Sequence, residues 1–257
     1  METKINTEVY DRLGERWYSA FDDPIALLRA QSRLRNPWII EILKKTFDAN
    51  PCQVLDIGCG AGFLSNELAR QKHHVTGIDL SEETLEVARR HDETRTVNYM
   101  RADATNLPFE DARFEVVCAM DFLEHVESPA VLIREISRVL KPGGLFFFHT
   151  FNRNPLSGLL AIKLLEWFVR NTPKNMHIYR LFIKPPELGK YCADAGLDDM
   201  QFIGLKPVLW TRKNPFGTLK AFSSGSVPKD FRFEFTPSLA VGYSGYARRR
   251  NSQTASQ

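Results

Sequence analysis

Short apolar runs and amphipathic stretches alternate through the middle of the chain. Runs typical of buried strands begin at Val54, Val75, Val97, Phe114 and Leu145. Helix signals separate them: Ser81 can cap a helix with an acidic first turn, and the helix signal at 129–140 stops before Pro142. Strands separated by helices predict a parallel sheet covered on both faces.

The C-terminal part adds a helix signal at 186–195 and two strand signals at 200–205 and 239–247. The sequence therefore predicts an α/β fold with a seven-stranded, mostly parallel sheet and an antiparallel last hairpin. The expected domains are an N-terminal helical extension over 1–50, a main domain over 51–247 with an amphipathic insertion at 152–182, and a disordered tail over 248–257.

Three glycines, Gly58, Gly60 and Gly62, follow the first apolar run, and an acid, Asp79, lies at the end of the second. Glycines let the backbone approach a ligand where any Cβ would clash. An acid at the end of a second parallel strand can accept both hydroxyls of a ribose. The combination predicts a cofactor that contains a nucleoside.

The glycine spacing and the acid before it indicate which nucleoside to expect. Dinucleotide sites use Gly-x-Gly-x-x-Gly, whereas this chain has Gly-x-Gly-x-Gly preceded by Asp56. A carboxylate there repels a diphosphate and suits a cationic amino group. The pattern resembles motif I of the Rossmann-like, class I methyltransferases that use S-adenosylmethionine. A structural glycine turn and an NAD site are the alternatives.

The resemblance implies a role for each acid near the predicted loop. Asp56 and the glycines would hold the methionine end of S-adenosylmethionine, and Asp79 with the neighbouring Leu80 would hold the ribose. Asp103, with the backbone of Ala104, would accept the exocyclic amine of the adenine. A solvated loop carboxylate is the alternative for Asp103.

Three side chains that can bind a metal or a proton follow the fourth strand signal: Asp121, Glu124 and His125. Their spacing aims all three the same way if the segment is one helical turn. Together they can hold a divalent cation such as Mg²⁺ that ionises a catechol-like diol. Alternatively, His125 alone acts as a general base, or Glu124 and His125 are only a capped helix start beneath the cofactor.

Four segments carry a narrower resemblance. Residues 121–126, 140–144, 150–154 and 182–188 resemble, in order and spacing, the UbiG-type ubiquinone-biosynthesis O-methyltransferases. That family methylates a ring hydroxyl of a polyprenylated catechol or hydroquinone. The resemblance implies cofactor contacts at Gly58, Asp79 and Met120. It also implies a divalent ion at Asp121, Glu124 and His125.

Three positions depart from the family pattern. The family usually has Glu where this chain has Asp121, which shortens one metal ligand. Relatives carry a cofactor-binding arginine soon after an Asn-Pro pair, whereas here only the preceding Arg33 or Arg35 can substitute. Relatives tend to have Ser at the position of His149, whose imidazole would either serve as a base in the cleft or lie buried and hydrogen-bonded.

The segment 155–170 is strongly amphipathic, because its few charges leave a wide apolar face. It is too short to span a bilayer. Such a helix can lie in a membrane interface with Trp167 at the headgroups, or it can cover the core as a lid. Side chains that can meet anionic lipid follow it: Lys174, His177, Tyr179 and Arg180.

Composition fits one soluble enzyme of 257 residues, and a net charge of +3 gives no sign of a nucleic-acid partner. Four cysteines without Cys-x-x-Cys spacing, and an N-terminus without an apolar signal core, favour the cytoplasm, with peripheral attachment to the inner face of the membrane as a further hypothesis.

We therefore expect in-line methyl transfer from S-adenosylmethionine to a ring hydroxyl of a polyprenylated catechol or hydroquinone in ubiquinone biosynthesis, beside other enzymes of the pathway. Two alternatives are kept. One is a methyltransferase for another small lipophilic acceptor, at oxygen or carbon. The other is a non-catalytic, membrane-associated accessory protein that binds S-adenosylmethionine.

Overall fold

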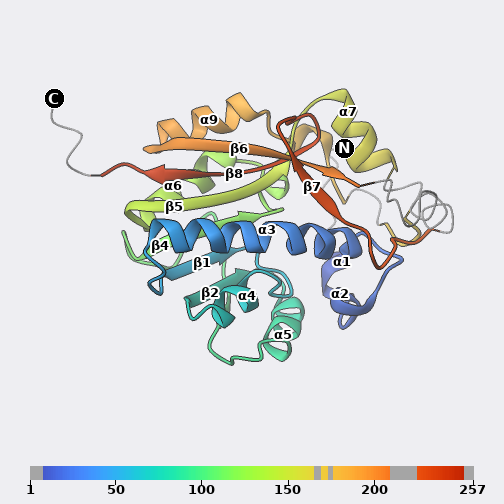
Figure 1. Ribbon diagram of the computed structural model, residues 1–257, viewed down its shortest axis with the longest axis horizontal. Helices are drawn as coiled ribbons and strands as arrows, with labels where there is room; N and C mark the ends of the chain where they lie inside the picture. The colour runs from blue at the N-terminus through green and yellow to red at the C-terminus, as the bar shows by residue number, and fades with distance from the viewer. Residues whose placement is uncertain (1–7, 165–168, 173–175, 209–224, 252–257) are drawn as a thin grey trace.

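The computed structural model describes residues 8–164, 169–172, 176–208 and 225–251. Eight strands form one sheet in the order β3-β2-β1-β4-β5-β8-β6-β7 (Figure 1). The strands are β1 (Gln53–Ile57), β2 (His74–Asp79), β3 (Asn98–Arg101), β4 (Phe114–Met120), β5 (Leu140–Phe151), β6 (Leu197–Pro207), β7 (Phe233–Thr236) and β8 (Gly242–Arg249).

Helices cover both faces of the sheet. The α-helices are α1 (Glu8–Asp11), α2 (Arg16–Ser19), α3 (Ile25–Thr46), α4 (Ser65–Arg70), α5 (Glu82–Arg90), α6 (Pro129–Val139), α7 (Pro155–Gly158) and α9 (Pro185–Asp194). The shorter helical turns are η1 (Leu123–His125) and η3 (Tyr179–Leu181), which are 3-10 helices, and η2 (Leu159–Leu164), which is a π-helix.

The first five strands run parallel, as the alternating pattern predicts. β8 is antiparallel to both its neighbours, β5 and β6, and β7 adds an antiparallel edge strand to β6. The predicted fold class is therefore confirmed, with eight strands instead of seven. The strand that was missed is β7, which has four residues.

The expected tail was wrong at its start. Arg248 pairs with Leu145 of β5, and Arg249 pairs with Leu197 of β6, so both belong to β8. Their guanidinium groups donate to backbone carbonyls, Arg248 to Gly143 and Arg249 to Arg138 at 3.2 Å. These bonds hold the arginine-rich end of the chain on the sheet. The last part of the predicted tail, 252–257, lies outside the described residues.

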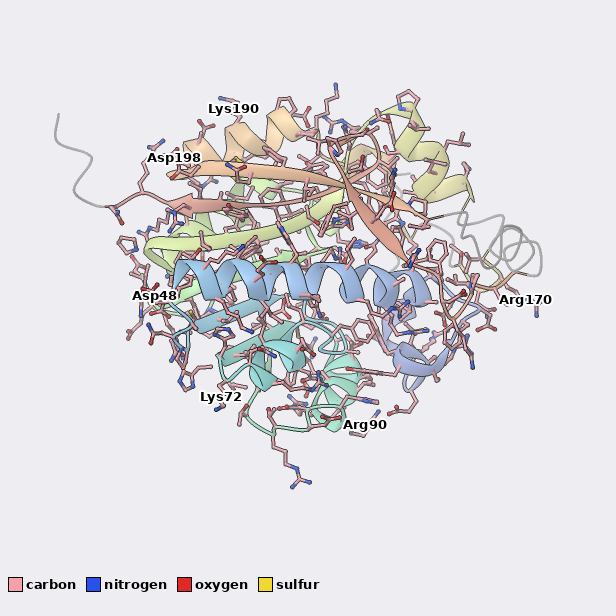
Figure 2. The ribbon with its side chains drawn as sticks, in the orientation of Figure 1. Asp48, Lys72, Arg90, Arg170, Lys190 and Asp198 are labelled. Atoms are coloured by element: carbon pink, nitrogen blue, oxygen red, sulfur yellow. The ribbon has the colours of Figure 1, made fainter. Side chains whose placement is uncertain are left out.

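Alternation along β4 shows how the sequence builds two cores. Val116 and Cys118 face the side covered by α3 and α4, whereas Val117 and Ala119 face the side covered by α6 and α9 (Figure 1). Because both faces are covered, the strand carries apolar residues at successive positions. Charged side chains such as those of Lys72, Arg90 and Lys190 lie at the periphery (Figure 2).

The glycine loop between β1 and α4 has the left-handed backbone that favours glycine. Gly58, Gly60 and Gly62 have φ angles of +64°, +51° and +81°. A Cβ at Gly62 would overlap the hydroxyl of Tyr99, which donates a 2.8 Å hydrogen bond to Asn66. Gly62 therefore serves the packing of the loop on β3 and α4.

The predicted amphipathic helix is only partly described. Its described part is α7, one turn long, continued by the π-helix η2 as far as Leu164. Asn154 caps α7 by accepting a 3.0 Å hydrogen bond from the backbone N–H of Ser157. Trp167 lies outside the described residues. In the described ranges, no helix has both the length and the apolar character needed to cross a bilayer.

Candidate active site

A cavity of about 460 Å³ opens at the carboxyl ends of β1, β2 and β4. This is where ligands bind in open parallel sheets. The predicted cofactor residues that line it are Asp56, Gly58, Gly60, Asp79, Leu80 and Met120. Six of the nine predicted cofactor residues therefore line the cavity, including the exposed Leu80, whereas Gly62, Asp103 and Ala104 do not.

Asp79 and Asp56 occupy different depths of this cavity. The Asp79 carboxylate accepts hydrogen bonds of 3.0 Å from the backbone N–H groups of Gly60 and Ser81, which ties the glycine loop to β2. Asp56 is buried and accepts a 2.6 Å hydrogen bond from the Ser65 hydroxyl. Burial raises the pKa of Asp79, and it raises the pKa of Asp56 to about 7.

Two other predicted cofactor positions lie away from the cavity lining. Asp103 is exposed, and its carboxylate accepts 2.8 Å hydrogen bonds from the N–H and the hydroxyl of Thr105. These bonds lower the pKa of Asp103. Ala104 is buried in the core beside it. The nearby residue that lines the cavity is Arg101. The adenine contact of Asp103 and Ala104 stays a prediction.

The N-terminal segment forms part of the cavity wall. The sequence did not predict this contribution. Tyr10, Asp11 and Trp17 line the cavity, and the Trp17 ring occupies the space beside Gly60. Burial, together with the charge of Glu124, raises the pKa of Tyr10, so its phenol stays neutral. No hydrophobic period or glycine signal marks these short helices, so only contacts identify them.

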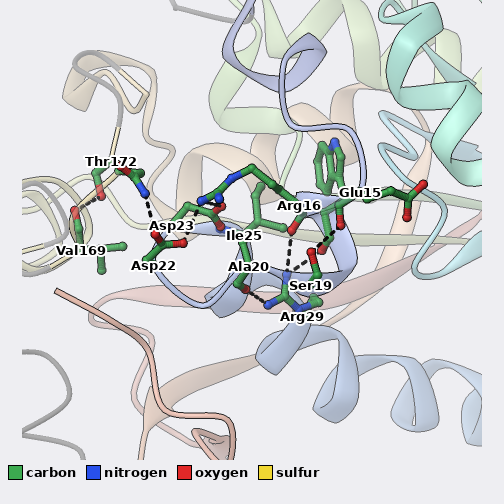
Figure 3. Close-up of polar contacts among 12 residues, drawn as sticks. Glu15, Arg16, Ser19, Ala20, Asp22, Asp23, Ile25, Arg29, Val169 and Thr172 are labelled. Atoms are coloured by element: carbon green, nitrogen blue, oxygen red, sulfur yellow. Dashed lines mark hydrogen bonds and ion pairs between the residues drawn. The ribbon is translucent and has the colours of Figure 1, made fainter. Parts of the chain in front are cut away.

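Polar contacts hold this segment in place (Figure 3). Arg29 of α3 donates to the carbonyls of Trp17, at 2.6 Å, and Ala20, and Arg16 pairs with Asp22 at 2.8 Å. Glu15 pairs with Arg90 of α5 at 2.9 Å. These contacts fix the backbone that carries the aromatic rings beside the cavity.

Asp121 is bound by an arginine and does not join the other two candidate metal ligands. Both guanidinium nitrogens of Arg35 donate to its carboxylate, one at 2.9 Å, and Arg35 is 3% exposed. Asp121 also has φ +57°, a strained value for a residue with a Cβ. Although burial opposes it, the charge of Arg35 lowers the pKa of Asp121. Of the two candidate arginines, Arg35 therefore faces the site, and Arg33 donates to the carbonyl of Phe231.

His149 lies behind Asp121 and not in the cavity lining. It is fully buried, its Nδ1 is 2.9 Å from the Ser244 hydroxyl, and its Nε2 is 3.5 Å from Asp121. Burial lowers the pKa of His149 to about 3. The buried, hydrogen-bonded alternative describes this placement, while the role of a base in the cleft finds no access to the cavity.

His177 takes the place that the sequence assigned to Asp121. The candidate ligand atoms of Glu124, His125 and His177 all lie within 4.8 Å of one another. The His177 ring stacks on His125 with centroids 5.8 Å apart and meets Phe151 edge-on at 5.1 Å. His177 therefore packs against these rings, and its predicted contact with anionic lipid stays a prediction. A lone histidine far along the chain from Glu124 and His125 gives no sequence signal for this role.

Glu124 is buried in this cluster, His125 and His177 are half-buried, and several of their polar atoms lack partners. In the described part of the chain, the two carboxyl oxygens of Glu124 and the Nδ1 of His125 have no hydrogen-bond partner. Burial, with the nearby charge of Asp121, raises the pKa of Glu124 to about 8. Burial lowers the pKa of His125 to about 4 and that of His177 to about 3. A carboxyl group that keeps its proton at neutral pH and two neutral imidazoles therefore lie beside the cofactor cavity.

The sheet order, the glycine loop and the acid-lined cavity define a class I S-adenosylmethionine-dependent methyltransferase. The family model described as a methyltransferase domain matches residues 55–148. Magnesium protoporphyrin IX methyltransferase from Synechocystis PCC 6803, solved with bound SAH, has the same fold with a TM-score of 0.64 and 16% identity over 95% of both chains. A SAM-dependent methyltransferase from Thermotoga maritima has a TM-score of 0.58 and 19% sequence identity, and the match covers 95% of this chain and 99% of that one.

Relatives at higher identity narrow the class. The ubiquinone biosynthesis O-methyltransferase of Nitrosospira multiformis is 36% identical over 78% of this chain and 83% of that protein. Its counterpart in Leptothrix cholodnii is 39% identical over 74% of this chain and 80% of that protein. The chain belongs to the ubiquinone biosynthesis O-methyltransferase family, which confirms the resemblance found in the sequence.

We predict that Asp121→Asn lowers the free energy of unfolding by about 3 to 5 kcal/mol at neutral pH, because it leaves the buried Arg35 guanidinium unpaired. Urea unfolding followed by circular dichroism measures this loss. The folded pKa of Asp121 is lowered, so the difference from the unchanged chain begins to shrink below about pH 4 and disappears as the pH falls through the folded pKa.

The matched control is Glu41→Gln, which breaks the exposed pair of Glu41 with Lys45 on α3. Exposed pairs of this kind contribute about 0 to 1 kcal/mol. A loss for Asp121→Asn no larger than that of the control would contradict the anchoring role of the Arg35 pair.

Proposed function

We propose that this enzyme transfers a methyl group from S-adenosylmethionine to a ring hydroxyl of a polyprenylated catechol or hydroquinone intermediate of ubiquinone biosynthesis. The observation that carries the proposal is the cluster of Glu124, His125 and His177 beside the cofactor cavity, in a chain whose relatives are named for this pathway. The cluster offers a group that can assist the loss of the hydroxyl proton.

The chain's own residues mainly orient the two substrates. Asp56 and the glycine loop hold the methionine end of the cofactor, and Asp79 holds its ribose. The acceptor oxygen attacks the sulfonium methyl in line, and its lone pair forms the new carbon–oxygen bond as the carbon–sulfur bond breaks. A phenolic hydroxyl ionises only near pH 10, about as tyrosine does, so the site must assist the loss of its proton.

We further propose that Glu124, His125 and His177 hold a divalent cation, with His177 in place of Asp121. The fit rests on the buried Glu124 oxygens and the His125 nitrogen that lack partners. One carboxylate and two imidazoles suit a borderline transition ion better than Mg²⁺, which prefers oxygen ligands. When bound, such an ion would lower the pKa of the acceptor hydroxyl.

The first prediction here concerns Glu124. Glu124→Gln removes the carboxyl group that can bind a cation or accept a proton, and it should lower the rate of methyl transfer about 100-fold or more, with little change in the affinity for S-adenosylmethionine. Steady-state kinetics and calorimetry measure the two quantities. Chelation should abolish methyl transfer, and added Mn²⁺ or Zn²⁺ should restore it. Calorimetry with the ion alone should show binding, and Glu124→Gln should weaken that binding.

Glu127→Gln is the matched control, because Glu127 is exposed in the same loop and pairs with Arg180 at the surface. It should keep the full rate. Full methyl transfer by Glu124→Gln would remove the role of Glu124. A chelated protein with an unchanged rate would remove the cation and leave Glu124, whose pKa is raised toward 8, as the base.

The second prediction identifies the acceptor. A strain that lacks the protein should accumulate a polyprenylated ring compound one methyl group short of the normal intermediate, as measured by mass spectrometry of extracted quinones. The purified enzyme should methylate the hydroxyl of that compound. An unchanged quinone pool, or a methyl group found on ring carbon, would refute the proposed acceptor.

We also propose that residues 155–180 contact the membrane that holds such an acceptor. Leu156 and Leu159 are 48% and 46% exposed, and Tyr179 is 41% exposed. The Tyr179 ring lies against Gly158, which stands between Leu156 and Leu159 in the sequence. Exposed apolar side chains grouped in this way favour a peripheral position on a bilayer.

The third prediction tests this contact. Replacing Leu156 and Leu159 together by Asp should reduce co-sedimentation with vesicles of phosphatidylglycerol and phosphatidylcholine by about 10-fold, because two apolar side chains leave the interface. Val131→Asp on α6, also at an exposed apolar position, should bind vesicles as the unchanged protein does. Equal sedimentation of all three proteins would argue against membrane contact.

A further inference from the structure

Tyr10 stands between the two parts of the active site. Its ring stacks on Trp17, with centroids 5.7 Å apart and planes at 25°, and meets His125 edge-on at 6.4 Å and 87°. Trp17 in turn lies 3.2 Å from the position that a Cβ on Gly60 would occupy. A row of rings therefore runs from the cofactor loop to the acceptor cluster, and Tyr10 is its middle member.

The cofactor loop is bordered by aromatic rings on a second side as well. A Cβ at Gly58 would overlap the ring of Phe122, which follows β4 and lines the same cavity as Tyr10 and Trp17. Of the three rings, Tyr10 is the one that also contacts the acceptor cluster, through His125. The methyl group must cross from donor to acceptor at this boundary.

Methyl transfer changes the charge of the donor at this boundary. The sulfonium carries one positive charge, and the carbon–sulfur bond leaves its electron pair on sulfur, so the product S-adenosylhomocysteine has a neutral thioether. Asp56 and Asp79 are assigned to the amino and ribose groups, which donor and product share. They therefore do not distinguish the two. An aromatic ring that attracts a cation does distinguish them.

We propose that the ring of Tyr10 sets the preference of this enzyme for S-adenosylmethionine over S-adenosylhomocysteine. The proposal rests on the assigned cofactor and concerns its binding alone. The carbonyl of Tyr10 accepts a 3.4 Å hydrogen bond from the Thr84 hydroxyl of α5, which ties its backbone, and the ring itself is oriented by stacking on Trp17. A neutral thioether lacks this cation–π attraction and keeps only the weaker contact of sulfur with a ring, so loss of the methyl group weakens the binding of the product.

The test compares the dissociation constants of S-adenosylmethionine and S-adenosylhomocysteine by calorimetry. Tyr10→Leu should weaken the first about 3- to 30-fold and the second less than about 2-fold, whereas Tyr10→Phe should keep both. An analogue with a charged amine in place of the sulfonium should follow S-adenosylmethionine. Equal weakening of all three ligands, or no weakening, would overturn the proposal.

Tyr18→Leu is the matched control, because the Tyr18 ring stacks on His91 at 3.6 Å and its hydroxyl donates to the carbonyl of Ala61. It should affect donor and product equally. The ratio of the two constants is unaffected by a partly unfolded sample, since unfolding reduces the binding of both. The test uses no acceptor, so its result does not depend on whether the proposed acceptor is correct. If the unchanged protein bound neither ligand, the cofactor assignment itself would be refuted.

Discussion

The buried ion pair between Arg35 and Asp121 joins the parts of the chain that make the active site. Arg35 belongs to α3, and Asp121 follows β4 with a left-handed backbone. A buried guanidinium without its carboxylate costs several kcal/mol, so α3 is restricted to one position on the sheet. α3 carries Arg29, which holds the aromatic N-terminal segment over the cavity. On the other side of Asp121, His149 and Ser244 extend the polar contacts to β8.

This pair also divides the acids at the site into two kinds. Asp121 stays ionised because Arg35 compensates its charge, while the nearby Glu124 has a raised pKa because it is buried and close to Asp121. His125 and His177 stay neutral, because burial disfavours their charged forms. The arrangement leaves one carboxyl group and two imidazoles next to the cavity that we assign to the cationic cofactor, so one ion pair supports both halves of the proposed reaction.

The sequence predicted those features of the site that depend on residues close together in the chain. The glycine loop needs positive φ angles, and Asp79 ends a buried strand, so both are visible in a short window of sequence. The cluster after β4 was only partly predicted: helical spacing joined Asp121 to Glu124, but a short 3-10 turn and a left-handed residue direct Asp121 to Arg35 instead. The position of β8 between β5 and β6 was not predicted, because pairing between distant strands leaves no periodic signal.

The sequence by itself determined the fold class, the cofactor and the family, because these depend on hydrophobic periodicity and on glycines and acids at fixed spacing. Only the tertiary structure decided which polar side chains meet. Arg35 and Asp121 are 86 residues apart, and His177 reaches His125 from beyond β5. Such pairs are selected by the high energy of a buried charge or polar atom without a partner, and that energy exists only once the chain has folded around them.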